Sequence, residues 1–379
     1  MLKRKILFFT DWYPPAYKAG GPIVSVYNLS RALKNNFEIL VLTGTKDLGE
    51  SNVLNGISPN KISEQNGVQV IYQDPNTIKK DFLGNLIGDF NPKIIWVSGL
   101  FSAKFSVLPI LRFRKSHKLI VSPRGMLHPS ALQIKSFKKK LFLTFIKLKG
   151  IHKDVLWHAT NYTEKEYIQN QFGNEISCLV ASNLSKPFND ANLITEKAKG
   201  GLKLLVLGRI AEEKNSQFAL EVLAASKNAN IQMHFYGNDG GGSYSKVFHK
   251  RLKELQHAGY KVGYKGSANP AVLEGEVFPK YHYMYLPTQG ENFGHAISDS
   301  LANSTPVLIS DKTPWTELAS HGCHVVENQL QIQSDLLNSL FHEDNDSYSK
   351  KAESAVRYYK KYLLESTELN KYLNFLNQL

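Results

Sequence analysis

The sequence has almost no cysteine. Only Cys178 and Cys323 occur among its 379 residues, far apart and outside any cluster of cysteine and histidine. Disulfide-stapled domains and structural zinc sites need cysteines in closely spaced sets. The sequence therefore indicates neither kind of site, and it fits a protein of the reducing cytoplasm.

Long hydrophobic runs are also missing. A membrane-spanning helix needs about 18–20 predominantly apolar residues in succession, and no segment approaches that length. The basic residues 3–5 and the apolar residues 6–9 imitate a signal peptide, but the run stops at Thr10, short of the roughly 7–15 apolar residues that a signal peptide needs. We expect a buried first strand there and a chain that does not cross a membrane.

Repeats and low-complexity tracts are absent, and a content of 42% hydrophobic and 21% charged residues is typical of a globular protein. A chain of this length exceeds one ordinary core, because domains usually hold roughly 100–200 residues. Two domains are therefore expected.

The net charge of +13 arises in the first half of the chain. Residues 1–190 hold 26 Lys and Arg against 13 Asp and Glu, whereas residues 191–379 hold 20 of each. A one-sided basic surface commonly binds nucleic acid, acidic lipid or a phosphorylated substrate. No nucleic-acid-recognition motif accompanies the charge, so we do not expect nucleic acid to be the partner.

Short apolar segments alternate with longer helix-compatible segments along the whole chain. This alternation predicts an α/β fold with parallel sheets and crossover helices. Strands are expected at 5–10, 37–43, 68–72, 94–98, 119–122, 155–159, 203–208, 231–236, 262–264, 283–286, 307–309 and 324–326, and helices at positions such as 24–33, 102–112 and 216–225.

The polar stretch 183–201 contains a proline and ends in two glycines, which is typical of a linker. We therefore divide the chain into a first doubly wound domain at 1–185, a second at 186–346, and C-terminal helices at 347–379 that cross back to the first domain.

Gly20 and Gly21 follow the first expected strand and precede a helix. In open α/β sheets such turns face the ligand crevice, and glycine lets backbone amides approach a phosphate or sugar. A merely flexible turn is the alternative. The absence of a G-x-G-x-x-G pattern argues against a dinucleotide site.

Arg209 follows the apolar strand 203–208, and Lys214 comes five residues later near a helix start. The planar guanidinium and the compact ammonium group suit a diphosphate clamp that stabilises a leaving phosphate. The alternative is a surface arginine that pairs with Glu212 or Glu213.

The segment 285–295 follows another strand and leads directly into a helix expected at 296–302. Backbone amides at such a helix start can hold an anion, while nearby carboxylates bind sugar and ribose hydroxyls. Two capping or solvated acids are the alternative. The residues singled out here are Glu291, Asn292, Phe293, Gly294, His295 and Asp299.

Residues 134–149 contain six lysines and no acid, interleaved with apolar residues. Helical spacing makes this segment basic and amphipathic, and such a helix can lie in an anionic membrane interface. The alternative is a helix that packs its apolar side into the first domain while its lysines face water.

Asp344 and Asp346 have the D-x-D spacing of metal-dependent transferases. They follow no buried strand, so we expect a turn or a helix cap rather than a metal site. No metal and no cofactor is predicted.

Taken in order, these motifs resemble the donor-binding domain of the GT-B glycosyltransferases, specifically the retaining family 4 (glycosyltransferase group 1) of the polysaccharide-assembly type. Gly20-Gly21 and the segment 122–127 extend the resemblance over nearly the whole chain. The matching order is Gly208-Arg209-x4-Lys214, Tyr236-Gly237, Gly266, Glu291-Asn292-Phe293-Gly294, Asp299-Ser300-Leu301-Ala302 and Pro306-Val307.

The resemblance implies two Rossmann-like domains facing a central cleft, and transfer with retention and without an essential metal. It implies that Arg209 and Lys214 contact the donor diphosphate, that Glu291 holds the transferred sugar, and that Asp299 contacts the ribose. The remaining donor-binding positions would be Gly20, Gly21, Gly237, Asn292, Phe293, Gly294 and His295.

Three departures from the family pattern concern the sugar. The second acid of the family is usually glutamate but is Asp299 here, and the usual glycine before the Pro-Val pair is Ser304. Arg124 stands where many relatives carry a histidine, which leaves His128 as a substitute on the acceptor or sugar side.

The resemblance predicts transfer of a hexose-type sugar from a nucleoside diphosphate to a saccharide carried on polyprenyl diphosphate, in bacterial capsule, O-antigen or exopolysaccharide synthesis. We expect a cytoplasmic protein, peripheral on the inner face of the plasma membrane. The alternatives are another GT-B enzyme, such as an epimerase or phosphorylase, and a degenerate nucleotide-sugar-binding protein.

Overall fold

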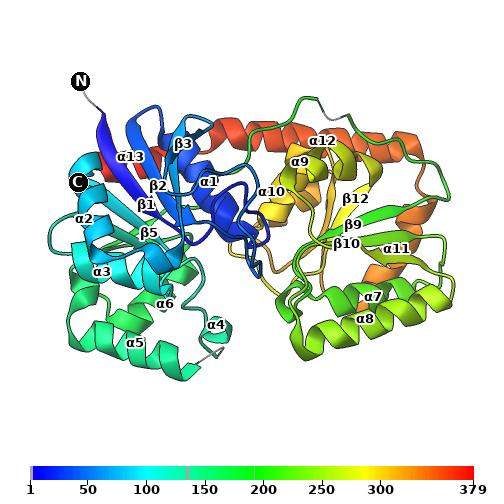
Figure 1. Cartoon of the computed structure of the whole chain (residues 1–379). Helices are drawn as coiled ribbons and strands as arrows, with labels where there is room; N and C mark the ends of the chain where they lie inside the picture. The colour runs from blue at the N-terminus through cyan, green and yellow to red at the C-terminus, as the bar shows by residue number, and fades with distance from the viewer. Residues whose placement is uncertain (1–2, 134–135, 192) are drawn as a thin grey trace. The chain divides into compact units, whose positions relative to one another are not determined.

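A computed structural model describes residues 3–133, 136–191 and 193–379. The chain forms two compact units (Figure 1): unit 1 takes Met1–Leu184 and Thr367–Leu379, and unit 2 takes Ser185–Ser366. Each unit is built on its own sheet with helices on both faces. The predicted α/β fold with two sheets of parallel strands is confirmed.

Unit 1 has an eight-stranded sheet in the order β3-β4-β2-β1-β5-β6-β7-β8. Every neighbouring pair is parallel except β3 and β4, which are antiparallel. The strands are β1 (Arg4–Phe9), β2 (Phe37–Gly44), β3 (Ile62–Gln65), β4 (Val68–Gln73), β5 (Ile94–Ser98), β6 (Lys118–Ser122), β7 (Leu156–Ala159) and β8 (Cys178–Val180).

The helices of unit 1 are α1 (Gly21–Leu33), α2 (Lys80–Phe90), α3 (Leu108–Phe113), α4 (Pro129–Gln133), α5 (Ser136–Leu148), α6 (Tyr162–Phe172) and α13 (Glu368–Gln378). The helix expected at 102–112 is confirmed at 103–113, but its first part, Ala103–Val107, is a π-helical turn before α3. Pro109 has no N–H to donate to the preceding turn, so a regular α-helix cannot run through this point.

Unit 2 has a six-stranded, wholly parallel sheet in the order β11-β10-β9-β12-β13-β14. Its strands are β9 (Lys203–Leu207), β10 (Gln232–Tyr236), β11 (Lys261–Tyr264), β12 (Tyr283–Leu286), β13 (Val307–Ser310) and β14 (His324–Val326). Its helices are α7 (Ser216–Ala225), α8 (Gly242–His257), α9 (Pro270–Val272), α10 (His295–Ala302), α11 (Leu330–His342) and α12 (Asn345–Glu365).

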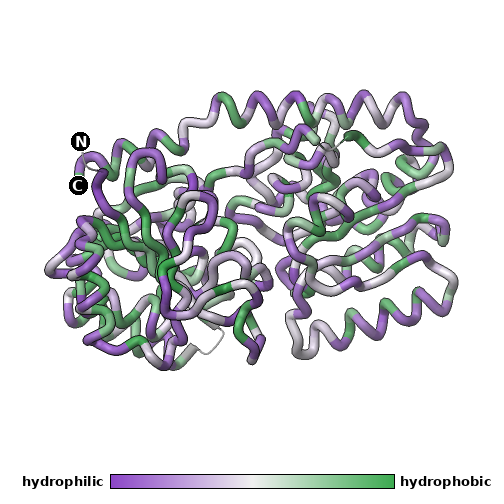
Figure 2. Tube along the Cα trace, turned by 45° about the horizontal axis from the view of Figure 1, so that its top comes forward, coloured by the Kyte–Doolittle hydropathy of each residue, from purple (hydrophilic) through white to green (hydrophobic). Residues whose placement is uncertain are grey.

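The C-terminal segment is divided between the units. Figure 2 shows hydrophobic and hydrophilic residues alternating along α12, whose Tyr359 is buried in unit 2 among the side chains of α10 and β13. Helix α12 ends at Glu365 with Ser366 as its C-cap, and α13 places Tyr372 and Leu376 in the core of unit 1. Of the segment 347–379, therefore, Thr367–Leu379 belong to unit 1 and the rest to unit 2.

Buried polar groups fasten α13 to the sheet of unit 1. The Tyr372 hydroxyl lies 2.9 Å from His158 Nε2, and His158 Nδ1 lies 2.9 Å from Ser122 Oγ. The Ser122 hydroxyl in turn accepts a 2.7 Å hydrogen bond from Trp96 Nε1. Burial holds the pKa of His158 well below its usual value, so the ring is neutral and its nitrogens can serve both as donor and as acceptor.

Within the residues that the structure describes, no helix combines the length and the apolar character needed to cross a lipid bilayer.

Candidate functional site

The sheet of unit 2 contains a topological switch point between β9 and β12. Leu204 and Val206 of β9 face the core shared with α7, whereas Leu205 faces the core shared with α10. The helices that follow β9 and β12 therefore cover opposite faces of the sheet. In open α/β sheets the loops at such a point diverge and leave a crevice at the carboxyl ends of the strands, where ligands bind.

Lys214 and Glu291 meet at this switch point. Lys214 lies in a 3₁₀ turn, Glu212–Lys214, that follows β9, and Glu291 lies in the loop after β12. Lys214 Nζ lies 2.5 Å from Glu291 Oε1, and their side chains are 26% and 11% exposed. The structure thus pairs two of the predicted site residues from loops 77 positions apart.

Arg209 lies directly after β9 with a more exposed side chain, at 55%. Its guanidinium is paired with Glu213, which is the partner that the surface-arginine alternative proposed. The two groups remain near the protein surface, where an ion pair contributes little energy. A diphosphate with more charge than one carboxylate would compete well for the same guanidinium.

Backbone hydrogen bonds fix the loop after β12. Thr288 Oγ1 and the Gln289 amide both donate to the Glu213 carbonyl, at 2.8 and 2.9 Å, and the Glu291 amide donates to the Lys312 carbonyl at 3.1 Å. The Glu291 carboxylate is therefore held opposite Lys214 by the backbone of both segments. The sequence motif did not reveal these supporting residues.

Further support comes from Asn328 and Gln333, which the sequence analysis missed. Asn328 Nδ2 donates to the Thr288 carbonyl at 3.0 Å, and Gln333 Nε2 donates to Asn328 Oδ1 at 3.0 Å. The buried Tyr285 hydroxyl of β12 donates to Gln333 Oε1. Asn328 and Gln333 lie after β14, more than thirty residues beyond the loop, so no local sequence pattern links them to it. Only the strand order could have indicated this contact.

The first turn of α10 follows Gly294, whose φ of +83° is accessible mainly to glycine. A side chain here would also strike Ile297, since its Cβ would lie 2.9 Å from Ile297 Cδ1. Trp315 Nε1 donates to the Phe293 carbonyl at 2.5 Å and fixes the approach to the helix. His295 begins α10, with its ring 4.8 Å from that of Phe293, and Asn292 is exposed at the loop.

Asp299 lies in the middle of α10 and is only partly reached by solvent. Burial raises the pKa of its carboxyl group to about 6, the nearby Lys186 ammonium opposes this rise, and Glu274 adds to it. Lys186 and Glu274 form an ion pair with each other. A carboxylate that is so poorly hydrated has a strong tendency to accept hydrogen bonds from a ligand.

Gly237 allows the strands β9 and β10 to approach closely at their carboxyl ends. Its φ is +146°, and a Cβ at this position would lie 2.0 Å from the Gly208 carbonyl oxygen. Gly208 and Gly237 therefore pack backbone against backbone beside Arg209. Gly241 precedes α8, whose first residue is Gly242.

In unit 1, Gly20 and Gly21 lie where the sequence places them, at the start of α1. Gly20 has a φ of +64°, and nothing lies within 4 Å of a Cβ built there. Arg124 has a φ of +55°, and its Nη1 donates to Asn183 Oδ1 at 2.5 Å. His128 lies in an exposed turn before α4, with its ring 5.3 Å from that of Tyr167.

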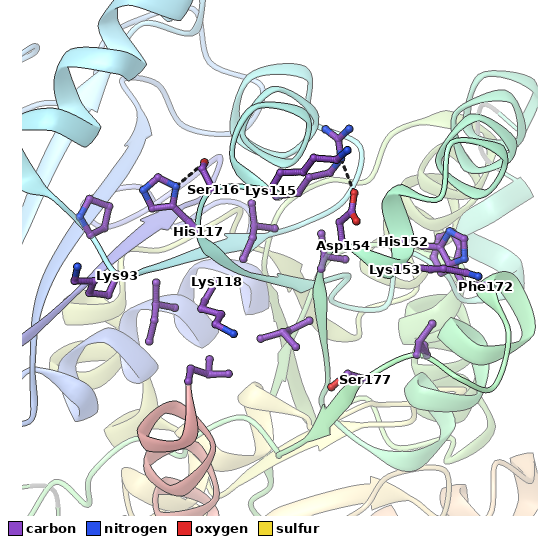
Figure 3. Close-up of a pocket in the computed structure, with 18 of the residues that line it drawn as sticks. Lys93, Lys115, Ser116, His117, Lys118, His152, Lys153, Asp154, Phe172 and Ser177 are labelled. Carbon is purple, nitrogen blue, oxygen red and sulfur yellow. Dashed lines mark hydrogen bonds and ion pairs between the residues drawn. The ribbon is translucent and has the colours of Figure 1, made fainter.

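A cavity of about 1370 Å³ lies at the opposite, amino edge of the unit 1 sheet (Figure 3). Its lining is basic, with Lys93, Lys115, Lys118 and Lys153, and Arg114 is paired with Asp154 at 3.0 Å. The cavity contains none of the predicted site residues. Ligands of open α/β sheets bind at the other edge, so the cavity does not define the site.

Asp344 caps α12, because its Oδ1 accepts the Ser347 amide at 2.9 Å. The predicted helix cap is confirmed. No group of three or more His, Cys, Asp or Glu side chains suited to a metal ion occurs in the described ranges.

Comparisons with known proteins bear on the fold and the family. Residues 190–362 match the model of the family "Glycosyl transferases group 1". No curated protein sequence matches the chain. Similar solved structures, by contrast, span its full length.

Sucrose-phosphate synthase from Thermosynechococcus elongatus has a TM-score of 0.72 at 13% identity, covering 99% of both chains. HepE from Anabaena, in complex with UDP-glucose, has a TM-score of 0.69 at 15% identity, covering 99% of this chain and 100% of that one. A trehalose-6-phosphate protein from E. coli, bound with UDP-2-fluoro glucose, has a TM-score of 0.67 at 9% identity, covering 100% and 99%. The chain has the GT-B fold of glycosyltransferases, and its residues 190–362 match the glycosyl transferases group 1 family.

Proposed function

We propose that this protein transfers a sugar, with retention, from a nucleoside-diphosphate sugar to a hydroxyl group of a saccharide. The observation that carries the proposal is the pairing of Lys214 with Glu291 at the switch point of a glycosyl transferases group 1 domain, with Arg209 beside it. The pair lies at the carboxyl ends of β9 and β12, and ligands of open α/β sheets bind at such a position.

The proposed chemistry breaks the bond between the sugar and the diphosphate. Negative charge then develops on the leaving phosphate, and Lys214, Arg209 and the N-terminus of α10 are the groups that stabilise it. Positive charge develops on the sugar ring, where the Glu291 carboxylate and the loop backbone hold the hydroxyl groups. No side chain is assigned as general base, and the leaving phosphate itself is the group that we propose accepts the proton of the attacking hydroxyl.

For the donor we propose a UDP-sugar, because HepE and the trehalose-6-phosphate protein are both bound to UDP-sugars. Asp299 then contacts the ribose. A ligand that binds only the folded state raises its stability, by about 2.7 kcal/mol at one hundred times Kd. We expect UDP and UDP-glucose to raise the melting temperature by several degrees.

The experiment is a thermal-shift screen of the wild-type chain against UDP-, GDP-, ADP- and dTDP-sugars, with UMP as the matched ligand lacking the second phosphate. UMP should give a much smaller shift, because the diphosphate clamp then holds one phosphate fewer. The proposal of a nucleoside-diphosphate-sugar site fails if none of the four diphosphates moves the transition.

We further propose a lipid-linked acceptor and peripheral attachment to an anionic membrane through α5 (Figure 1). The helix has two apolar faces. Leu143 and Ile146 are buried in the core of unit 1. The outer face carries Phe137, Leu141, Phe145 and Leu148, which are 79%, 63%, 41% and 80% exposed.

These four side chains recur at spacings of four, four and three residues, so they form one stripe along the helix. The exposed lysines Lys138, Lys140, Lys147 and Lys149 accompany them, and α5 contains no acid. An apolar stripe with lysines only suits the interface of an anionic bilayer. Of the predicted segment 134–149, residues 134 and 135 lie outside the described residues.

Lys139 differs from its neighbours. Its Nζ donates to the Ala131 carbonyl at 2.6 Å and lies 5.1 Å from the centroid of the Phe101 ring. Lys139 therefore packs against unit 1, and the lysines to test for membrane binding are Lys138, Lys140 and Lys147.

Replacing Phe137 and Leu141 together by serine is expected to reduce binding to vesicles of phosphatidylglycerol and phosphatidylcholine by about tenfold or more, since each large apolar side chain gains over 1 kcal/mol on burial. Co-sedimentation measures the bound fraction. Leu364→Ser is the matched control, because this residue of α12 is 88% exposed but stands beside Lys361 and Glu365, which form an ion pair with each other. Equal sedimentation of all three chains would remove α5 as the membrane contact.

A further inference from the structure

Unit 1 has a switch point of its own. Ile6 and Phe8 of β1 face the core that contains α1 and α13, whereas Leu7 and Phe9 face the core that contains α3. In the strand order, β1 pairs with β2 on one side and with β5 on the other. The loops after β1 and β5 therefore diverge, and the crevice at their carboxyl ends is the second ligand position that the topology creates.

Two polar side chains from these loops meet there. Asp11 follows β1 and Ser102 follows β5, and the Ser102 hydroxyl donates to Asp11 Oδ1 at 2.6 Å. The other carboxylate oxygen faces Gly99, where a Cβ would lie 3.9 Å from Asp11 Oδ2. Gly99 has a φ of +106° and no side chain, and a Cβ built there would also lie 3.3 Å from Ser106 Oγ and 3.4 Å from Met126 Cε.

Asp47, in the same unit, shows what a purely structural aspartate looks like. Its carboxylate accepts the backbone amides of Tyr17, Lys18 and Leu48, at 2.7 to 3.2 Å. Asp11, by contrast, accepts one side-chain hydroxyl among the described residues and holds no backbone amide. Its burial raises the pKa of the carboxyl group, and the Ser102 hydroxyl opposes that rise. A half-buried carboxylate with one oxygen unused is a strong acceptor for an added hydroxyl group.

We infer that Asp11, oriented by Ser102, binds a hydroxyl group of the acceptor saccharide at the β1/β5 switch point of unit 1. The inference rests on the proposed function, because it supplies that reaction with a residue that binds its acceptor. A carboxylate accepts hydrogen bonds and repels anions, so the group bound here is a sugar hydroxyl and not a phosphate. Ser102 is a positioning residue, since its hydroxyl fixes the carboxylate without itself meeting the sugar.

The test compares Asp11→Asn, Ser102→Ala and the control Asp154→Asn, which changes an aspartate at the opposite edge of the same sheet. Release of UDP from UDP-glucose is measured with octyl β-glucoside, octyl β-galactoside and octyl N-acetyl-β-glucosaminide as acceptors. Asp11→Asn should raise the acceptor KM about tenfold or more, because it replaces a charged acceptor of the hydrogen bond. Ser102→Ala should raise it less, and Asp154→Asn should not.

The donor KM and the thermal shift with UDP should stay within twofold of wild type in all three variants, because Asp11, Ser102 and Asp154 are not among the residues proposed to bind the donor. An unchanged acceptor KM in Asp11→Asn overturns the inference, as does a loss of UDP binding that accompanies it. If none of the octyl glycosides accelerates UDP release by the wild-type chain, the saccharide hydroxyl is the wrong ligand class for this position. Failure of the wild-type chain to bind UDP overturns the proposed function instead.

Discussion

Lys214→Ala is expected to lower the transfer rate by about 10²–10³-fold or more, the loss typical of removing one group that stabilises a developing anion. The ammonium group is the least exposed cation at the β9/β12 switch point, and it lies 2.5 Å from Glu291. Its removal deletes the charge that we propose stabilises the leaving phosphate. It also leaves a carboxylate that is 11% exposed without its partner.

Arg209→Ala separates these two effects. Arg209 is exposed and pairs with Glu213 at the surface, so its loss should cost activity with little change in stability. Lys214→Ala should instead lose activity and some stability together, because an unpaired, poorly hydrated carboxylate is costly. Lys214→Arg keeps the charge and should recover part of the rate, and Lys246→Ala, an exposed lysine of α8, is the neutral control.

The measurement is UDP release from UDP-glucose, with the free energy of unfolding determined on the same preparations. Near-normal turnover by both Arg209→Ala and Lys214→Ala would falsify the diphosphate clamp. A normal donor KM with reduced turnover would mean that the two cations stabilise the transition state and contribute little to binding of the donor in the ground state.

Asp299→Asn is expected to stabilise the protein while weakening donor binding. Burial raises the pKa of the Asp299 carboxyl group to about 6, so the ionised form is disfavoured in the folded chain. One pKa unit corresponds to about 1.4 kcal/mol, and after allowance for the partial exposure of this side chain we expect a gain of about 2 kcal/mol at pH 8. An amide cannot replace the carboxylate as a double acceptor of ribose hydroxyls, so the donor KM should rise about tenfold.

The stability gained by Asp299→Asn should increase with pH. The pKa of Asp299 is higher in the folded state than in the unfolded state, so the stabilisation from the protonated carboxyl is fully present below about pH 4 and is lost as the pH rises through about 6. Asparagine does not titrate. The difference between variant and wild type should therefore grow between pH 4.5 and pH 7 and then level off.

Urea unfolding at several pH values measures this difference, and Asp346→Asn is the control because that aspartate is exposed and pairs with the exposed Lys350. A constant difference across the pH range would mean that Asp299 is not the titrating group. A stabilised variant with unchanged donor KM would remove Asp299 from the ribose site.

The sequence predicts the central elements well because their patterns are local. The strands 283–286 and 324–326 and the helix 216–225 are predicted to the residue, since short apolar strands and an amphipathic helix leave a strong local signal. The short strands β3 and β8 are missed. β3 has alternating exposure with a single strongly apolar residue, and β8 has only three residues.

The candidate site is predicted in part for the same reason. Lys214 and Glu291 each lie in a recognisable motif, but their distance depends on β9 and β12 being neighbours, which the strand order alone determines. Asp11 and Ser102 have no motif at all. They become neighbours only because the central position of β1 brings two loops together across 91 residues.

The division of unit 1 between both ends of the chain has a consequence for its synthesis. The ribosome releases the N-terminal residues first, and domains usually fold in that order as they emerge. Tyr372 of α13, however, packs in the core beside Trp96 and His158. The core of unit 1 therefore cannot be completed until unit 2, which precedes α13 in the chain, has been translated. A helix that is translated after unit 2 therefore completes unit 1, and a nascent chain that does not yet contain α13 leaves the apolar surface around Trp96 uncovered.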